Sequence, residues 1–114
     1  KALELYPEYV DAWIRKGITL FNDKQLFEAE NCFNTAVHLR PTEFKAVYNR
    51  GKLRFQTENN EGALADLDKA TSLKPEHAGA HELFGDVLMK TGKETEAAIQ
   101  WRIAEELRKK KKPT

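Results

Sequence analysis

Two histidines have the spacing that a metal site on a helix would require. His77 and His81 stand four residues apart, which can place two ring nitrogens on one side of a helix. Neither histidine belongs to an HExxH pattern, and the other candidate ligands, Cys32 and His38, lie in a different part of the chain. We therefore interpret the two histidines as exposed residues at the start of a helix, and we expect no metal site.

Cys32 is the single cysteine, so the chain cannot form an internal disulfide. No histidine stands near Cys32 at a spacing typical of a nucleophilic site, and the sequence has no glycine-rich phosphate-binding loop. We expect no catalytic residue, no enzymatic activity and no cofactor. A free thiol fits the cytoplasm or another reducing intracellular compartment.

A basic run, Arg108 and Lys109 to Lys112, lies near the end of the sequence. It could attract nucleic acid, anionic lipid or an import receptor, or it could be a solvated helix end, where cations are favourable. Without these five residues, 14 basic groups remain against 18 acidic ones, which argues against a nucleic-acid partner. No apolar run approaches the roughly 18 residues that a membrane-spanning helix needs.

The segments that position these residues recur every 34 residues. Gly17 is followed at this interval by Gly51 and Gly85, and Ala29, Ala36 and Leu39 are each repeated twice in the same way. A fixed period of this length is typical of stacked repeats. Residues 1–9 match the end of one such unit, so we expect the chain to be cut from a longer protein.

Each unit contains two segments with apolar residues at the three-and-four spacing of a helix. Asn22 and Asp23 suit a tight turn because both residues tolerate left-handed backbone angles. Pro41 and Pro75 stop the second helices, and no segment alternates like a half-buried strand. The predicted helices cover about 8–21, 25–39, 43–56 after Thr42 as N-cap, 61–73, 76–90, and 94 to beyond Arg108.

The residues that mark the first unit have the order and spacing of the tetratricopeptide repeat: Trp13, Gly17, Leu20, Ala29, Phe33, Ala36 and Pro41. The sequence resembles this family over residues 1–108. The resemblance implies an all-α fold, a right-handed α-solenoid of stacked antiparallel helical hairpins. It divides the chain into 1–9 (tail of a preceding repeat), 10–43, 44–77 and 78–108 (three repeats), and 109–114 (basic tail).

Four positions depart from the family pattern, and we expect weaker packing at each of them. Val47 and His81 replace an aromatic residue, Arg54 replaces the large residue matched by Leu20, and Lys109 replaces the closing proline.

Gly17, Gly51 and Gly85 lie mid-helix, where glycine costs roughly 1 kcal/mol relative to alanine. We expect a close approach there by a second backbone, with Ala29, Ala63 and Ala97 as facing residues. The large residues expected to fill the space between successive hairpins are Trp13, Phe33, Leu67, Phe84 and Trp101.

In this family the first helices of successive repeats line a concave groove that holds a peptide or a helix. The resemblance therefore implies a noncatalytic protein-interaction scaffold. The groove residues carried over by position are Ile14, Ile18, Phe21, Lys45, Tyr48, Asn49, Lys52 and Phe55. They suit a partner with hydrophobic and acidic or polar groups. The alternative is that these side chains pack on one another or on a segment outside this sequence.

Co-chaperones of the family grip the C-terminal carboxylate of heat-shock proteins with charged and amide side chains. Asn49 matches one clamp position, but the remaining positions hold Ile14, Ile18, Gly79 and Leu83, which cannot make charged contacts. We therefore expect no binding of a heat-shock protein tail.

Two further functions remain open from the sequence. One is end-to-end self-assembly into a homo-oligomer, through apolar residues at the two ends of the array. Those residues are Ala2, Leu3 and Leu5 at one end and Ile99, Trp101 and Ile103 at the other. The second is a module that serves an enzyme located elsewhere in a longer chain.

Overall fold

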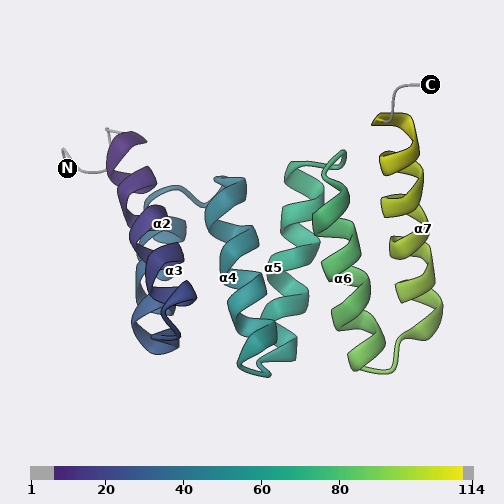
Figure 1. The fold of residues 1–114 in the computed structure, drawn as a ribbon, viewed down its shortest axis with the longest axis horizontal. Coiled ribbons are helices and arrows are strands. Elements are labelled where there is room, and N and C mark those ends of the chain that lie inside the picture. Colours follow the sequence, from purple (N-terminus) through teal and green to yellow (C-terminus); the bar gives the residue numbers. More distant parts are fainter. Residues whose placement is uncertain (1–6, 112–114) are drawn as a thin grey trace.

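The computed structural model describes residues 7–111, which form six helices and no strand. Their bounds are α2 Pro7–Asn22, α3 Leu26–Leu39, α4 Phe44–Gln56, α5 Asn60–Leu73, α6 Ala78–Lys90 and α7 Glu94–Lys111. Consecutive helices pack side by side in chain order, as three hairpins (Figure 1). The first helices α2, α4 and α6 also contact one another and form one layer. The predicted all-helical solenoid is therefore confirmed.

The sharp turn inside each hairpin depends on one left-handed residue. Lys24 and Glu58 have φ of 65°, and Gly92 has φ of 86°. In the first turn the amide of Lys24 donates to the Phe21 carbonyl (3.0 Å) and that of Gln25 donates to the Leu20 carbonyl (2.9 Å). The same pair of bonds recurs in the other two turns, which makes each a Schellman motif. The left-handed residue is thus Lys24 and not the predicted Asn22 or Asp23.

Proline shapes the connection from one hairpin to the next. The Glu43 amide donates to the Arg40 carbonyl (3.1 Å), which closes a four-residue turn with Pro41 at its second position. The His77 amide closes the second such turn on Lys74, again at 3.1 Å. Proline favours this position because its φ is preset for the turn. Pro41 and Pro75 therefore stop one helix and direct the chain into the next, as predicted.

The helix starts differ from the predictions in their capping. Glu43, and not Thr42, is the N-cap residue of α4, and its side chain makes no capping hydrogen bond. Asn59 caps α5, since its side chain accepts a hydrogen bond from the Gly62 amide. His77 caps α6 through Nδ1, which accepts from the Ala80 amide at 3.0 Å.

The mid-helix glycines face rings and side chains, which corrects the prediction of alanine partners. A Cβ atom on Gly17 would lie 2.6 Å from the Phe33 ring, and one on Gly85 would lie 2.5 Å from the Trp101 indole. The corresponding neighbour of Gly51 is Leu67, together with the Asp66 Cβ. Phe33, Leu67 and Trp101 thus pack against the first helix of their own hairpin, at the glycine where this helix has no side chain. Phe33 and Leu67 also reach the next hairpin, as predicted.

Apolar clusters then join the hairpins to one another. Leu53 of α4 packs with Ala29 and Phe33 of α3. Val87 of α6 packs with Ala63 and Leu67 of α5. Each hairpin therefore buries its apolar side only against its neighbour, as expected of a repeat array.

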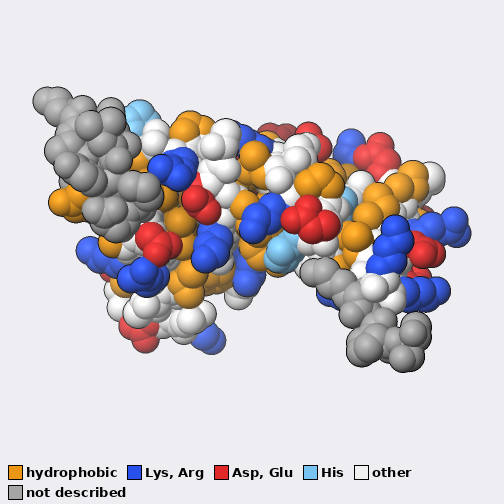
Figure 2. All heavy atoms as spheres, turned by 90° about the horizontal axis from the view of Figure 1, so that it is seen from above, with side chains coloured by type: hydrophobic (Ala, Val, Ile, Leu, Met, Phe, Trp, Pro, Cys, Tyr) orange, Lys and Arg blue, Asp and Glu red, His pale blue; other side chains and the backbone are white. Residues whose placement is uncertain are grey.

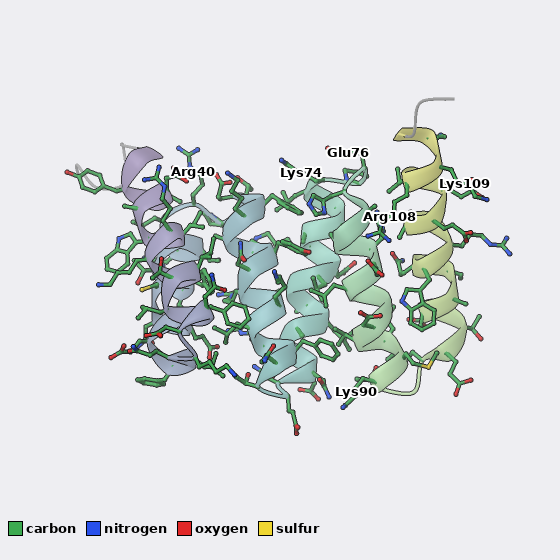
Figure 3. All side chains as sticks on the ribbon, viewed as in Figure 1. Arg40, Lys74, Glu76, Lys90, Arg108 and Lys109 are labelled. Carbon is green, nitrogen blue, oxygen red and sulfur yellow. The ribbon has the colours of Figure 1, made fainter. Side chains whose placement is uncertain are left out.

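The last helix continues to Lys111, which confirms that it runs past Arg108. Figure 3 labels Arg40 and Lys74 near the edge where α3 and α5 end. Figure 2 looks down on this edge, where Lys and Arg side chains are interspersed with Asp and Glu. None of the helices within residues 7–111 is long and apolar enough to cross a membrane.

Candidate peptide-binding groove

The layer formed by α2, α4 and α6 carries all eight residues predicted for the groove. Three of them, Ile14, Ile18 and Phe21, belong to α2, and the other five belong to α4. In α4, Lys45, Tyr48 and Lys52 follow the spacing that aligns side chains on one face of a helix. The structure therefore brings the predicted residues onto two neighbouring helices.

The α2 residues differ in how much surface they offer. Ile14 is only 2% exposed and packs with Val10, Ala36 and Ala46, so it belongs to the core beneath this face. Ile18 and Phe21 are partly buried and pack against the cluster that contains Leu53. These two side chains keep some surface for a partner, whereas Ile14 has almost none.

An aromatic cluster holds Tyr48 in place on the α4 face. Its ring stacks on Phe44 (centroids 5.2 Å apart, 14° between planes), and the His77 ring lies 5.2 Å from it. Gly79 provides the space for the phenol, since a Cβ on Gly79 would lie 3.3 Å from the Tyr48 hydroxyl oxygen. Burial, with a smaller effect of the nearby Glu82 carboxylate, raises the pKa of Tyr48. The phenol therefore remains a neutral donor and acceptor at physiological pH.

Two ammonium groups flank this tyrosine. Lys52 Nζ lies 5.6 Å from the centroid of the Tyr48 ring, and Lys45 is exposed one helical turn before the ring. Among the side chains described, those of residues 9–110, neither lysine has an ion-pair partner. Asn49 uses its amide nitrogen to donate to the Lys45 carbonyl at 2.7 Å. The α4 face thus combines an aromatic ring with two cations that form no ion pair with any of the described side chains.

The α6 side of the layer is acidic through Glu82 and Asp86, which the family resemblance also places at groove positions although they are not among the eight residues predicted to contact a partner. Glu82 pairs with Arg108 of α7 (2.7 Å), and Asp86 accepts a hydrogen bond from the Trp101 indole (3.1 Å). Glu82 and Trp101 also line a pocket of about 360 Å³ between α6 and α7. The spacing that placed Lys45 and Lys52 on one face also places Glu82 and Asp86 on one face, so the sequence contained this signal.

The histidine and cysteine residues considered as metal ligands or nucleophiles pack within the protein. His81 is 7% exposed, with Nε2 2.8 Å from the Pro75 carbonyl oxygen and Nδ1 2.7 Å from Gln100 Oε1, so it is not the exposed residue predicted. Cys32 is buried, and burial raises the pKa of its thiol, which disfavours the reactive thiolate. Within the described residues no group of three or more His, Cys, Asp or Glu could hold a metal ion.

The three hairpins, their shared first-helix layer and the glycine-to-ring contacts define a helical-repeat solenoid. A family model described as Tetratricopeptide repeat matches residues 25–75 and 48–102. The chain therefore belongs to the tetratricopeptide repeat family, whose members are protein-interaction modules.

Similar proteins agree with this assignment. The chain is 32% identical over 82 residues to Protein STIP1 homolog of Dictyostelium discoideum, covering 72% of this chain but only 14% of that protein. The structure of MamA residues 41-end from Desulfovibrio magneticus matches with a TM-score of 0.85 at 26% identity, over 97% of this chain and 63% of that one. The first TPR of Spaghetti (RPAP3), bound to the HSP90 peptide SRMEEVD, has a TM-score of 0.85 at 21% identity, covering 88% and 79% of the two chains, and shows the fold alone.

Proposed function

We propose that the chain is a noncatalytic scaffold that binds an acidic segment of a partner protein across α2 and α4. The observation that carries the proposal is the pair Lys45 and Lys52 on either side of the half-buried Tyr48. An exposed cation that forms no ion pair with the described side chains is available to a carboxylate, and a fixed aromatic ring offers contact area at low entropic cost.

The neighbouring side chains specify the rest of the ligand. Ile18, Phe21 and Phe55 are partly buried and present apolar surface beside the cations. We therefore expect a segment in which acidic residues alternate with hydrophobic ones. A heat-shock protein tail is not the proposed partner, because Ile14 is buried and Gly79 and Leu83 carry no charge.

A random peptide library displayed to the purified chain tests the charge preference. Peptides selected by the wild type should be enriched in Asp and Glu together with apolar residues. The double variant Lys45→Glu, Lys52→Glu should bind the selected peptides about tenfold or more weakly, since each exposed ion pair contributes roughly 0.2–1 kcal/mol and reversal adds repulsion.

A charge-matched control separates the groove from net charge. The double variant Lys69→Glu, Lys93→Glu changes two exposed lysines. Lys69 lies on α5 and Lys93 lies in the turn between α6 and α7, so neither belongs to the helices α2 and α4 of the proposed groove. It should retain the wild-type affinity. Equal losses in the two double variants would reject the groove, as would peptides with no acidic preference.

A further inference from the structure

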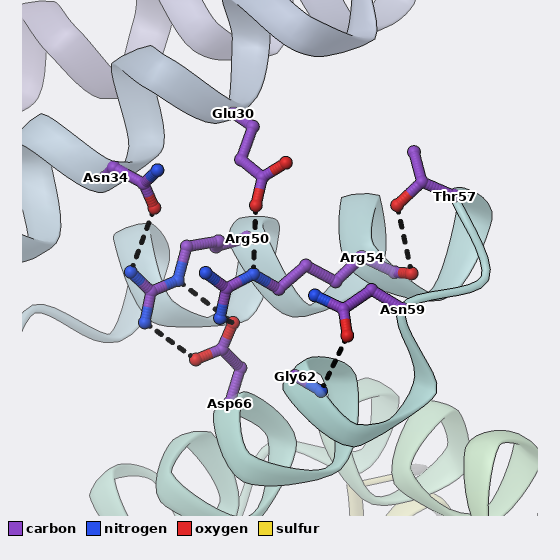
Figure 4. A network of polar contacts seen from close by, with 8 residues as sticks. All are labelled: Glu30, Asn34, Arg50, Arg54, Thr57, Asn59, Gly62 and Asp66. Carbon is purple, nitrogen blue, oxygen red and sulfur yellow. Dashed lines mark hydrogen bonds and ion pairs between the residues drawn. The ribbon is translucent and has the colours of Figure 1, made fainter.

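The junction between the first and second hairpins contains a charged cluster. Asp66 of α5 is 4% exposed and accepts two hydrogen bonds from Arg50 of α4, at 2.9 and 3.0 Å, and one from Arg54 at 3.2 Å. Both arginines also reach back to the preceding hairpin (Figure 4). Arg54 donates to Glu30 of α3 at 3.1 Å, and Arg50 donates to Asn34 of α3 at 3.1 Å.

The next junction has different residues at the same repeat positions. Moving by 34 residues replaces Glu30 with Leu64 and Arg54 with Leu88. Arg50 is likewise replaced by Phe84. Leu64 and Phe84 pack against the apolar cluster that joins α5 to α6. Asn34 and Asp66 correspond to Asp68 and Gln100, which are also polar. The first junction therefore has an ion pair, Arg54 with Glu30, where the second junction has two leucines.

The contacts within the second hairpin are more buried than the ion pair that crosses the junction. The Asp66 side chain is 5% exposed, so its bonds to the two arginines are shielded and hold α4 to α5 within one hairpin. The Glu30 side chain, which makes the ion pair across the junction, is 30% exposed. Salt screens exposed pairs far more than buried ones, whereas it leaves apolar contacts unweakened. Added salt should therefore loosen α3 from α4 without loosening α5 from α6.

We propose that the contacts of Arg54 with Glu30 and of Arg50 with Asn34 make the junction between the first two hairpins an ionic-strength-dependent hinge, with Asp66 holding both arginines in place. Opening of this hinge moves α2 away from α4 and so widens the groove between Ile18 and Lys52. The consequence for partner binding rests on the proposed groove, but the hinge itself does not.

Distance measurements between spin labels test the hinge with a built-in reference. Asn31, Ala65 and Ile99 are exposed and occupy the same position in the three hairpins. In a Cys32→Ser background, labels at Asn31→Cys and Ala65→Cys span the first junction, and labels at Ala65→Cys and Ile99→Cys span the second. Raising NaCl from about 0.05 to about 0.5 M should broaden the first distance distribution and leave the second unchanged.

Amide hydrogen exchange on the unlabelled chain gives a second readout. Exchange in α3 should become about threefold faster over the same salt range, while exchange in α6 stays constant. The double variant Glu30→Leu, Arg54→Leu copies the second junction and should remove the salt response from both measurements. Equal responses at the two junctions, no response at either, or a response that survives in this variant would overturn the hinge.

Discussion

At the scale of single residues, a missing side chain on one helix makes room for a ring on the next. Gly17 and Gly85 lie so close to Phe33 and Trp101 that an added Cβ atom would come within 2.6 and 2.5 Å of ring atoms. Around Gly51 the nearest atom, the Asp66 Cβ, would lie 3.1 Å away. The same glycine position in the repeat therefore tolerates an added side chain less well in the first and third hairpins than in the second.

The substitution Gly17→Ala should lower the free energy of unfolding by about 1–2 kcal/mol, because the ring clash outweighs the roughly 1 kcal/mol gain in helix propensity. Gly85→Ala should have the same effect. Gly51→Ala should change the free energy by less than about 0.5 kcal/mol, because a small shift of α5 at Asp66 and Leu67 relieves the contact and the gain in helix propensity offsets its cost. Urea denaturation followed by circular dichroism measures all three, and equal losses at Gly17 and Gly51 would contradict the ring-clash explanation.

Two residues that depart from the family pattern replace apolar packing with polar contacts. His81 replaces an aromatic residue but fills its site with two polar contacts, to Pro75 and Gln100. Arg54 replaces a large apolar residue and forms ion pairs with Glu30 and Asp66. These substitutions change the chemistry of a contact without removing the contact.

At the scale of elements, the three turns inside the hairpins have one geometry and three different residues at the left-handed position. A non-glycine residue pays roughly 1–2 kcal/mol there, against a smaller entropic cost for glycine. Lys24 and Glu58 accept this strain, whereas Gly92 avoids it. The first two turns therefore carry backbone strain that the third turn lacks.

The substitution Glu58→Gly should raise the free energy of unfolding by about 0.5 kcal/mol, and Gly92→Ala should lower it by about 1 kcal/mol. Thermal melting monitored by circular dichroism provides the measurement. The control is Gln56→Gly, which lies two residues earlier at the last residue of α4, where the backbone is helical, and should give no gain in stability. A stability gain at Gln56, or none at Glu58, would argue against the strain.

Helix caps offer a second comparison between equivalent elements. Gln25 and Asn59 precede α3 and α5 with nearly the same backbone angles (φ −91° and −85°, both ψ 74°), but only Asn59 makes a side-chain cap. Asn59→Ala should cost about 1 kcal/mol, and Gln25→Asn should gain about 0.5 kcal/mol. Denaturant titration measures the stability of both variants. A loss of stability in Gln25→Asn would show that an asparagine cap does not stabilise α3 as it does α5.

At the scale of the whole molecule, the register between hairpins bears on end-to-end assembly. Suppose that the first hairpin of one copy stacked on the last hairpin of another in the same way as neighbouring hairpins stack within the chain. The contact of Asn34 with Arg50 would then be replaced by one between Arg102 and Lys16, which occupy the equivalent repeat positions. Glu105 would likewise fall beside Trp13, where Val37 packs with Phe44 and Val47 inside the chain. Repulsion and a desolvated carboxylate both oppose such stacking.

We therefore expect the chain to be monomeric, as measured by light scattering coupled to size-exclusion chromatography. The double variant Arg102→Glu, Glu105→Leu removes both conflicts and should associate more than the wild type. A wild-type dimer that the charge change disrupts would instead support head-to-tail assembly.

The sequence by itself determined the helical pairs, their 34-residue period and the solenoid that they form. These features were predictable because helix periodicity, proline stops and repeat spacing are local properties of the chain. The groove was predictable only as a set of positions on α2 and α4. Partner contact at these positions remains a prediction.

Only the tertiary structure decided which side chains face one another across helices. It buried Ile14, placed Phe33 rather than Ala29 against Gly17, and joined Arg54 to Glu30, 24 residues apart in the sequence. The physical reason is that such contacts depend on the rotation of each helix and the register between hairpins. These are set by close packing of the whole array and leave no periodic mark in the sequence.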